Sequence, residues 1–378
     1  MDSKEEAKNA SINNSNGIDH EKLQHFLGKI ASDIGGALSA ILVYTGDKLG
    51  LYKAMADYNK NGPITSAELA RLTNTSERYV REWLANQAAG GYVTYDPSTG
   101  GFILPPEHAA ALVNENHPAY AAGAFQVTMA LFKDEPKFTN AFTTGKGVDW
   151  GEHDKDLFQG TERFFKPRYT ANLVSSWIPS LDKGKVEEKL KKGGAKVADV
   201  GCGHGISTIL MAKSYPNSKF VGFDNHPGSI DRARKIAKEQ EGLDEDRITF
   251  EVAAATDYPG DNEYDLVAFF DCLHDMGDPA GAAAHALKSL KSDGLLMIVE
   301  PFANDSLQEN LLNPSGRVFY ASSTMICVPA SLAHNGPAVG AQAGEAKIAE
   351  LVKAGGFKWF RRATQTPFNI VYEAKSWH

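Results

Sequence analysis

The chain has 378 residues, of which 42% are hydrophobic and 23% charged, a composition typical of a globular protein large enough for two domains. Its formal net charge of -8 at pH 7 argues against a non-specific nucleic-acid binder, which needs a basic surface. No continuous apolar run approaches the roughly 20 residues that cross a bilayer, and no secretory signal pattern is present. The three separated cysteines fit a reducing compartment. We therefore expect a cytoplasmic protein without a membrane partner.

Residues 1–18 are polar and offer almost nothing to bury, so we predict a disordered tail. Apolar residues then recur at helical spacing from Leu23 to Ile41 and continue from Leu49 to Met55. This periodicity predicts two helices, each with one apolar face.

A winged-helix arrangement is predicted between residues 65 and 104, inside a domain of residues 19–112. Thr65 begins a capped helix, a second helix follows a short turn, and residues 90–104 form two strand-like runs around a Gly-rich turn. DNA binding through the second helix is one interpretation. The charges of that helix sum to zero, so we favour a domain for dimerisation and for covering a substrate; the residues are Glu77, Arg78, Arg81 and Glu82.

Residues 113–190 are mostly helical in pattern, and we expect a linker and lid there. A Gly-rich, acidic stretch at 143–156 interrupts the helices and contains Trp150 and His153. An aromatic stripe from Phe164 to Ile178 follows at helical spacing. Such a stripe usually belongs to a core, but it directly precedes the next domain, so we expect part of it to close over that domain's ligand.

From residue 191 to 378 strand-like and helix-like segments alternate, which predicts an α/β domain with a mostly parallel, doubly wound sheet. The expected strands are 196–200, 219–223, 248–252, 265–270, 294–299, 357–363 and 368–374, and the expected helices are 206–214, 227–240, 280–291 and 345–354. Ligands of such sheets bind at the carboxyl ends of the strands. Those ends carry Asp199, Asp224, Ala254, Asp271 and Glu300.

The turn after the first of these strands is the most informative motif. Asp199 lies near the strand end, and Gly201, Gly203 and Gly205 follow at alternate positions. Glycines spaced in this way allow a sharp strand-to-helix turn and let a ligand lie against the main chain. Asp224 follows Gly201 by 23 residues, at the tip of the second strand, where an acid accepts hydrogen bonds from ribose hydroxyls. The pattern predicts a site for a cofactor that contains a nucleoside.

The glycine spacing separates two cofactor classes. The dinucleotide fingerprint has its third glycine where this chain has Ile206. The pattern Asp-x-Gly-x-Gly-x-Gly instead resembles motif I of class I S-adenosylmethionine-dependent methyltransferases, which implies a Rossmann-like fold. The resemblance also implies that Asp199 orients the methionine ammonium, that the glycines face the methionine part and that Asp224 holds the ribose. An ordinary strand–turn–helix with incidental glycines is the alternative.

The segment from Asp271 to Pro279 resembles the one after the fourth strand in small-molecule O-methyltransferases, where a Leu-His-Asp sequence supplies a general base. Carried over, the base is His274, with Asp275 or another nearby acid orienting its imidazole. A histidine titrates near neutral pH and suits removal of the acceptor's proton during an in-line methyl transfer. Two alternatives stay open: a histidine that only caps the strand, and a divalent metal held by Asp271, Asp275 and Asp278.

The resemblance also implies the remaining site residues. Ala254 stands where relatives often place an acid against adenine, so we expect backbone and apolar contacts to that ring. Further cofactor contacts are expected from Tyr169, Asn225, Ala255 and Asp271. Acceptor contacts are expected from Trp150, Glu300, Arg317 and Tyr320, since a long excursion at 301–344 follows the fifth strand and a planar guanidinium suits a carboxylate. A surface or ion-paired role is the alternative for Arg317.

From about residue 20 onward the chain resembles bacterial-type methyltransferases with an N-terminal winged-helix dimerisation domain. This resemblance implies S-adenosyl-L-methionine as cofactor and a homodimer formed through the N-terminal helices. It also implies methyl transfer to a hydroxyl, thiol or thioether of a small molecule. The alternative function is a winged-helix regulator that senses a ligand without catalysis.

Overall fold

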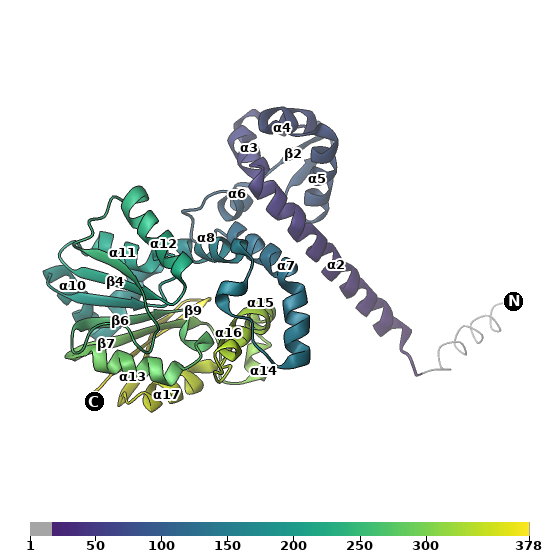
Figure 1. The fold of residues 1–378 in the computed structure, drawn as a ribbon. Helices are drawn as coiled ribbons and strands as arrows, with labels where there is room; N and C mark the ends of the chain where they lie inside the picture. The colour runs from purple at the N-terminus through teal and green to yellow at the C-terminus, as the bar shows by residue number, and fades with distance from the viewer. Residues whose placement is uncertain (1–16, 378) are drawn as a thin grey trace. The chain divides into compact units, whose positions relative to one another are not determined.

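The computed structural model describes residues 17–377, so the predicted tail lies outside the described residues except for its last two positions. The chain divides into two compact units, one ending at Asn114 and the other beginning at Glu115. Each unit has its own helices and strands (Figure 1). The helices predicted as a linker and lid are therefore part of the second unit.

The first unit confirms the predicted winged-helix elements. Thr65 caps the helix α4 as expected, because its hydroxyl accepts a hydrogen bond from the Glu68 amide. The two strands of the hairpin pair antiparallel, with Tyr95 opposite Phe102. The elements are α2 His20–Lys48, α3 Leu51–Tyr58, η1 Asn59–Asn61, α4 Ser66–Thr73, α5 Glu77–Ala89, β1 Thr94–Asp96, β2 Gly101–Ile103 and α6 Pro106–Leu112.

Helix α5 is the helix that would read DNA in a winged-helix regulator. Both of its arginines are paired one turn along the same helix, Arg81 with Glu77 at 2.6 Å and Arg78 with Glu82 at 2.7 Å. Phosphate binding would have to compete with these carboxylates. The pairing gives the regulator interpretation no support.

Helix α2 corrects one expectation from the sequence. It is long and apolar enough, by length and composition, to cross a membrane, although no continuous apolar run suggested it. The reason is that no charged residue stands between Asp33 and Asp47, where glycine, alanine and serine separate the larger apolar side chains. Helices that pack against other parts of a protein can have the same composition. The second half of α2 packs in this way, because the Trp83 indole of α5 donates a hydrogen bond to the Leu42 carbonyl at 2.8 Å.

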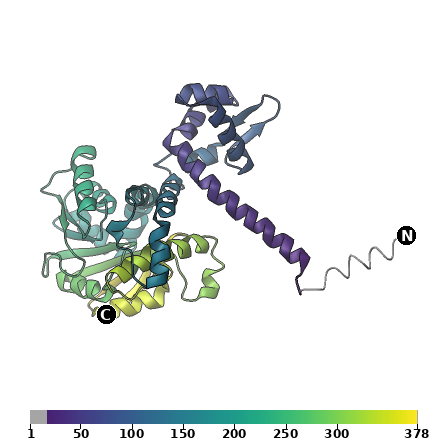
Figure 2. The same cartoon turned by 45° about the vertical axis from the view of Figure 1, so that its right-hand side comes forward.

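The first half of α2 extends beyond the small helices of its unit (Figure 2). Its large apolar side chains are exposed there: Leu23, Phe26, Leu27, Ile30, Ile34 and Leu38. A soluble monomer rarely leaves such a stripe uncovered.

The second unit begins with helices that lead to the sheet. They are α7 Ala122–Thr144, η2 Trp150–Glu152, α8 Lys155–Asn172, the π turn η3 Leu173–Trp177, α9 Ile178–Ser180, η4 Leu181–Gly184 and α10 Lys185–Lys192. The predicted aromatic stripe lies on α8 and η3. Tyr169, Leu173 and Trp177 are buried against the sheet, so most of the stripe is core.

The sheet has seven strands in the order β5-β4-β3-β6-β7-β9-β8, in which the first five are parallel and β9 is antiparallel to both of its neighbours, β7 and β8. The strands are β3 Lys196–Val200, β4 Lys219–Asp224, β5 Ile248–Val252, β6 Tyr264–Phe270, β7 Leu290–Pro301, β8 Trp359–Gln365 and β9 Asn369–Lys375. The predicted doubly wound sheet is confirmed. Because β3 lies between β4 and β6, the chain reverses direction across the sheet at this strand, and such a switch point opens a crevice for a ligand.

Helices cover both faces of this sheet (Figure 1). The covering helices are α11 Ile206–Ser214, α12 Pro227–Lys235 with the π turn η5 Ile236–Gln240, α13 Pro279–Ser289 and α17 Gly344–Ala354, while η6 Leu273–Asp275 follows β6. Alternate residues of each strand point to opposite faces of the sheet. Val197 and its neighbour Leu266 therefore lie in the core under α11 and α12, whereas Ala198 and Val267 lie in the core under α13 and α17.

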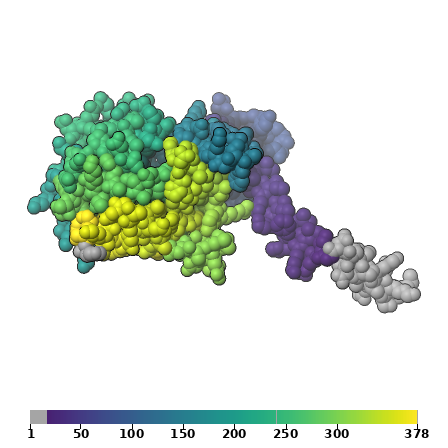
Figure 3. Space-filling view, turned by 60° about the horizontal axis from the view of Figure 1, so that its bottom comes forward, coloured from purple at the N-terminus to yellow at the C-terminus, as the bar shows by residue number. Residues whose placement is uncertain are grey.

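The excursion between β7 and α17 is helical. It contains α14 Leu307–Asn310, α15 Gly316–Ser322, η7 Ser323–Cys327 and α16 Val328–Ala333. It lies beside α7 (Figure 3), where Met325 and Ile326 pack against a buried cluster that includes Ala130 and Leu131 of α7. The excursion thereby forms one side of the space above the strand ends.

Candidate cofactor and acceptor site

A cavity of about 440 Å³ opens at the carboxyl ends of β3, β4 and β6. The glycine turn after β3 forms one wall, and the segment around Trp150 forms another. The sequence-predicted residues that line the cavity are Trp150, Tyr169, Gly201, Gly203, Asp224, Asn225, Ala254, Ala255, Asp271 and Asp275. Most of the predicted site is therefore brought together at one place.

The glycine turn adopts the backbone that its sequence predicts. Gly201, Gly203 and Gly205 all have positive φ, at 75°, 53° and 76°. A Cβ on Gly205 would also lie 2.5 Å from the Phe250 ring, so no larger residue fits where α11 begins. Gly205 itself is absent from the cavity wall and acts through this packing.

Asp199 lies fully buried behind the turn. Its Oδ2 accepts hydrogen bonds from Ser207 at 2.5 Å and Thr208 at 2.6 Å, while Oδ1 has no hydrogen-bond partner. Burial raises the pKa of this carboxyl to about 6, although the two hydroxyls oppose the shift. A buried carboxylate oxygen without a partner is suited to receive a cationic group from a ligand.

Asp224 reaches the cavity from the tip of β4. Its two oxygens accept hydrogen bonds from the main chain, from Gly203 at 2.8 Å and from His226 at 2.9 Å. These bonds fix the carboxylate and leave further lone pairs for hydroxyl groups of a ligand. Asn225, Ala254 and Ala255 lie on the same stretch of wall.

Asp271 stands at the end of β6 in a conformation unusual for a residue with a side chain, with φ at 50°. Tyr169 donates its hydroxyl to one oxygen at 2.7 Å, and Asn369 donates its amide to the other at 2.8 Å. Burial raises the pKa of Asp271 to about 7 against the effect of the Tyr169 bond. Tyr169 and Asn369 therefore hold this carboxyl in place at the cavity wall.

His274 lies buried just behind the cavity and does not line it. Its Nδ1 makes a short hydrogen bond to Glu300, and its Nε2 lies 3.3 Å from the Cys327 sulfur. Burial opposes an imidazolium, but the Glu300 carboxylate and Cys327 raise the pKa of His274 well above its ordinary value. The acid that orients the imidazole is thus Glu300, at the end of β7, rather than the adjacent Asp275.

Asp275 instead faces the cavity. Among the described residues, no side chain forms a hydrogen bond or an ion pair with its carboxylate, and a bond to its own backbone amide lowers its pKa. Burial raises its pKa to about 7, and the nearby charges of Glu300 and Asp224 act in the same direction, whereas His274 opposes them. Asp275 is the carboxylate in this wall that lacks a fixed partner.

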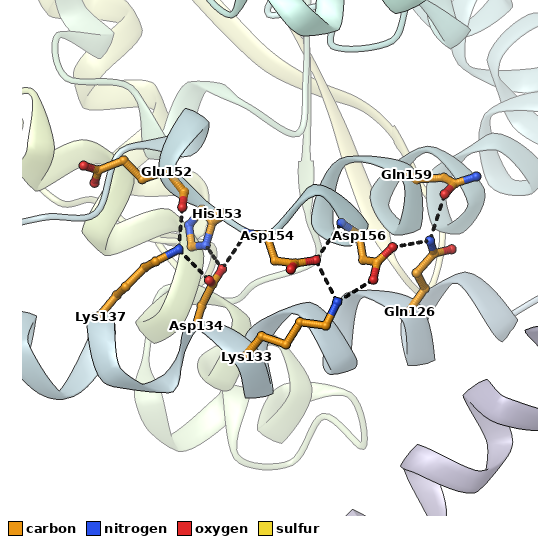
Figure 4. Close-up of polar contacts among 9 residues, drawn as sticks. All are labelled: Gln126, Lys133, Asp134, Lys137, Glu152, His153, Asp154, Asp156 and Gln159. Atoms are coloured by element: carbon orange, nitrogen blue, oxygen red, sulfur yellow. Dashed lines mark hydrogen bonds and ion pairs between the residues drawn. The ribbon is translucent and has the colours of Figure 1, made fainter.

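The wall segment that carries Trp150 is fixed to α7 by a polar cluster (Figure 4). Asp134 of α7 accepts from the Asp154 amide at 2.9 Å, meets His153 Nδ1 at 2.9 Å and pairs with Lys137 at 2.6 Å. Burial lowers the pKa of His153, so the ring is neutral at pH 7 and its Nδ1–H donates to Asp134. These contacts hold Trp150 at the cavity.

A second contact joins this segment to the excursion. Asp149 and His334, which both line the cavity, meet at 2.7 Å, and the Val148 amide donates to the Pro329 carbonyl at 3.1 Å. The cavity therefore lies under two segments that hold one another.

Three predicted acceptor residues lie away from the cavity wall. Glu300 is bonded to His274, Arg317 is exposed on α15, and the Tyr320 hydroxyl lies 3.4 Å from the Asn310 amide. Asp278, part of the alternative metal hypothesis, lines the cavity but caps α13 through the Gly281 amide at 2.8 Å. Among residues 17–377, no three His, Cys, Asp or Glu side chains are grouped so as to hold a metal ion.

Several residues of the site were not found from the sequence. Ser207 and Thr208 bind Asp199, and their positions in the first turn of α11 were a usable signal, since the first turn of a helix faces the preceding strand end. Cys327 and Asn369 reach the site from segments more than 50 residues away from their partners, and nothing local in the sequence marks them.

Comparison with known proteins agrees with this geometry. Residues 191–353 match the family model described as a methyltransferase domain, and residues 37–114 match the one described as an Rv2258c-like winged HTH domain. The mitochondrial ubiquinone biosynthesis O-methyltransferase of Candida albicans is 30% identical over 141 residues, which cover 36% of this chain and 43% of that protein. The chain thus spans about half or less of the length of the first curated relatives it matches.

Two solved structures share the fold over nearly the whole chain. A putative O-methyltransferase from Nostoc punctiforme has a TM-score of 0.66 at 19% identity and covers 92% of this chain and 98% of its own. Human N-acetylserotonin methyltransferase in complex with S-adenosylmethionine has a TM-score of 0.62 at 16% identity, with 96% and 99% covered.

The cavity also fits the cofactor of these proteins. The Asp224 carboxylate meets the need of ribose hydroxyls, and the glycine turn leaves the main chain open. Asp199 does not line the cavity: it is fully buried, and its unpartnered Oδ1 lies behind the turn. The apolar surface of Ala254 and Ala255 suits an adenine ring.

Proposed function

Because the chain belongs to the S-adenosylmethionine-dependent methyltransferases that carry an N-terminal winged-helix domain, we propose that it methylates a small molecule at a hydroxyl group. A thiol or a thioether is the alternative acceptor group. The observation that carries the proposal is the pairing of His274 with Glu300 directly behind the cavity. Cys272 and Asp275, which flank this histidine in the chain, both line the cavity.

The cofactor would be held by the glycine turn and Asp224, with Asp199 behind the turn, as described above, and supplies a methyl group activated by the positive sulfonium. The protein then has two tasks: to align the acceptor with that methyl group and to take the acceptor's proton. Trp150, Phe158 and Met276 line the cavity and offer apolar surface against which a small ring can be aligned.

His274 is the proposed proton acceptor. Glu300 holds Nδ1, and when the ring is in its neutral form, which the raised pKa shifts to higher pH, the proton of the acceptor hydroxyl passes to Nε2 as the oxygen–methyl bond forms and the sulfur–methyl bond breaks. Nε2 lies against the Cys327 thiol in the ligand-free protein, and the acceptor has to displace this contact. Hydrogen bonds of catalytic groups often take their final form only with the substrate bound, so the contact is compatible with the role.

The test is release of demethylated cofactor with a panel of phenols, hydroxy acids and thiols. His274→Ala should lower kcat for a hydroxyl acceptor by about 100-fold or more, since positioned general bases contribute 10²–10⁴-fold. A thiol acceptor should lose less, because it ionises more easily, and His117→Ala, at an exposed histidine, is the matched control. Unchanged turnover of a hydroxyl acceptor by His274→Ala would refute the base role.

We further propose that the active form is a homodimer. The exposed apolar stripe on the first half of α2 supports this, because a second copy of the chain is the simplest partner to cover it. Light scattering on the purified full chain tests the proposal.

A further inference from the structure

The polar wall of the cavity is unbalanced in charge. Six carboxyl side chains line it, namely Asp149, Glu162, Asp224, Asp271, Asp275 and Asp278. Two histidines of the lining, His204 and His334, are basic partners, and Arg232 lies 3.6 Å from Glu162 behind the wall, while the described lining itself contains neither lysine nor arginine. The proposed cofactor carries a sulfonium, an ammonium and a carboxylate, so its net charge of about +1 at neutral pH compensates only one carboxylate.

Five of the six carboxyls are already bound by the protein. Asp149 and Glu162 pair with the two histidines, at 2.7 and 2.8 Å. Asp224, Asp271 and Asp278 accept from the main chain or from uncharged side chains. Asp275 alone in this set has no such partner; it is half-buried at the cavity wall, where its carboxylate can accept a cation or a hydrogen-bond donor from a ligand.

The apolar part of the wall is rich in aromatic rings. Trp150 and Phe158 meet edge to face with centroids 5.3 Å apart, and Phe165 lines the same cavity. Aromatic faces attract cations as well as other rings. Such walls next to an unpartnered carboxylate match an aromatic molecule that carries an ammonium group.

We infer that the methyl acceptor is a cationic aromatic molecule, a hydroxylated arylalkylamine, with its ammonium group directed to Asp275. The inference rests on the proposed methyltransferase function. Carboxylate and phosphate acceptors are disfavoured because the wall has no lysine or arginine to receive them. The proposed acceptor, a cation, therefore differs in charge from the carboxylate acceptor named in the relatives called trans-aconitate 2-methyltransferase.

Three probes that share a 4-ethylphenol frame and differ in the terminal group test the inference: tyramine, 4-ethylphenol and 3-(4-hydroxyphenyl)propanoate. Their binding to the full chain, saturated with S-adenosylhomocysteine, is measured by calorimetry at pH 8. Tyramine should bind at least tenfold more tightly than 4-ethylphenol, and the propanoate at least tenfold more weakly. Equal binding of the first two, tighter binding of the propanoate, or no binding of any probe to the saturated protein overturns the inference.

Two variants test whether Asp275 is the carboxylate that binds the ammonium group. Asp275→Asn keeps the shape of the side chain and should weaken tyramine binding about tenfold, with less than a twofold change for 4-ethylphenol. Asp261→Asn, at an exposed carboxylate paired with Lys288, is the matched control and should change neither. An unchanged preference for tyramine in Asp275→Asn contradicts the assignment. If S-adenosylhomocysteine itself fails to bind, it is the proposed function that falls.

Discussion

Replacing Asp275 by asparagine should stabilise the ligand-free protein, and more so at high pH. The pKa of Asp275 is raised from 3.8 to about 7 in the folded protein, chiefly by burial. A carboxyl shifted upward favours the folded state when it is protonated, so this contribution is fully present below pH 3.8 and is lost as the pH rises through 7. Asparagine has no charge to bury, and its stability should not follow this curve.

The magnitude follows from the shift. About three pKa units correspond to about 4 kcal/mol at 1.36 kcal/mol per unit, of which about 2.5 kcal/mol falls between pH 5 and pH 8. Asp275 faces a cavity open to water, which lessens the penalty, so we expect the advantage of Asp275→Asn to grow by about 1 to 2 kcal/mol over this range. For a unit of this size that is about 2–8 °C in Tm.

The assay is thermal unfolding of both proteins without ligand from pH 5 to pH 8. Taking the difference between variant and wild type removes the contributions that both share, including that of Asp271. Asp261→Asn should show a flat difference over the same range, because that carboxylate is exposed. If the Tm difference between Asp275→Asn and the wild type stays constant or falls as the pH rises, the reasoning that this carboxylate is crowded and unpartnered is refuted.

Three further outcomes are expected. Glu300→Gln removes the charge that raises the pKa of His274, so the rise of kcat with pH should move to lower pH, and an unmoved pH profile would contradict the pairing. Gly205→Ala places a side chain at a φ of 76° and should lower the stability measured in urea by about 1–3 kcal/mol, whereas an unchanged midpoint would show that the turn tolerates it. Joint replacement of Ile34 and Leu38 by aspartate, at side chains that are 56% and 59% exposed, should convert the expected dimer to a monomer in light scattering, and a persisting dimer would place the interface elsewhere.

The sheet was predictable because its signals are local. The strand at 248–252 was delimited correctly, since a run of β-branched and aromatic residues is bounded by polar turns. β7 was expected to start at 294 but begins at Leu290, because Lys291, Ser292, Asp293 and Gly294 have the composition of a turn. Pairing with β6 through an irregular register overrides that composition.

The cofactor side of the site was predictable for the same reason: Asp199, the glycines and Asp224 lie on two consecutive strand–helix turns. The acceptor side was not. Glu300 was expected to meet the acceptor and instead binds His274, because adjacent parallel strands bring their ends together across 26 residues of sequence. Cys327 reaches the same imidazole from a helical excursion whose path no local pattern specifies.

Calorimetric titration of the full chain with S-adenosylhomocysteine tests the central claim, that the glycine turn between β3 and α11 binds this cofactor. One site per chain is predicted for the wild type, and Asp224→Ala should weaken binding by tenfold or more, because the ribose hydroxyls lose their acceptor. Absence of binding to the wild type, or equal binding to both proteins, would contradict the account.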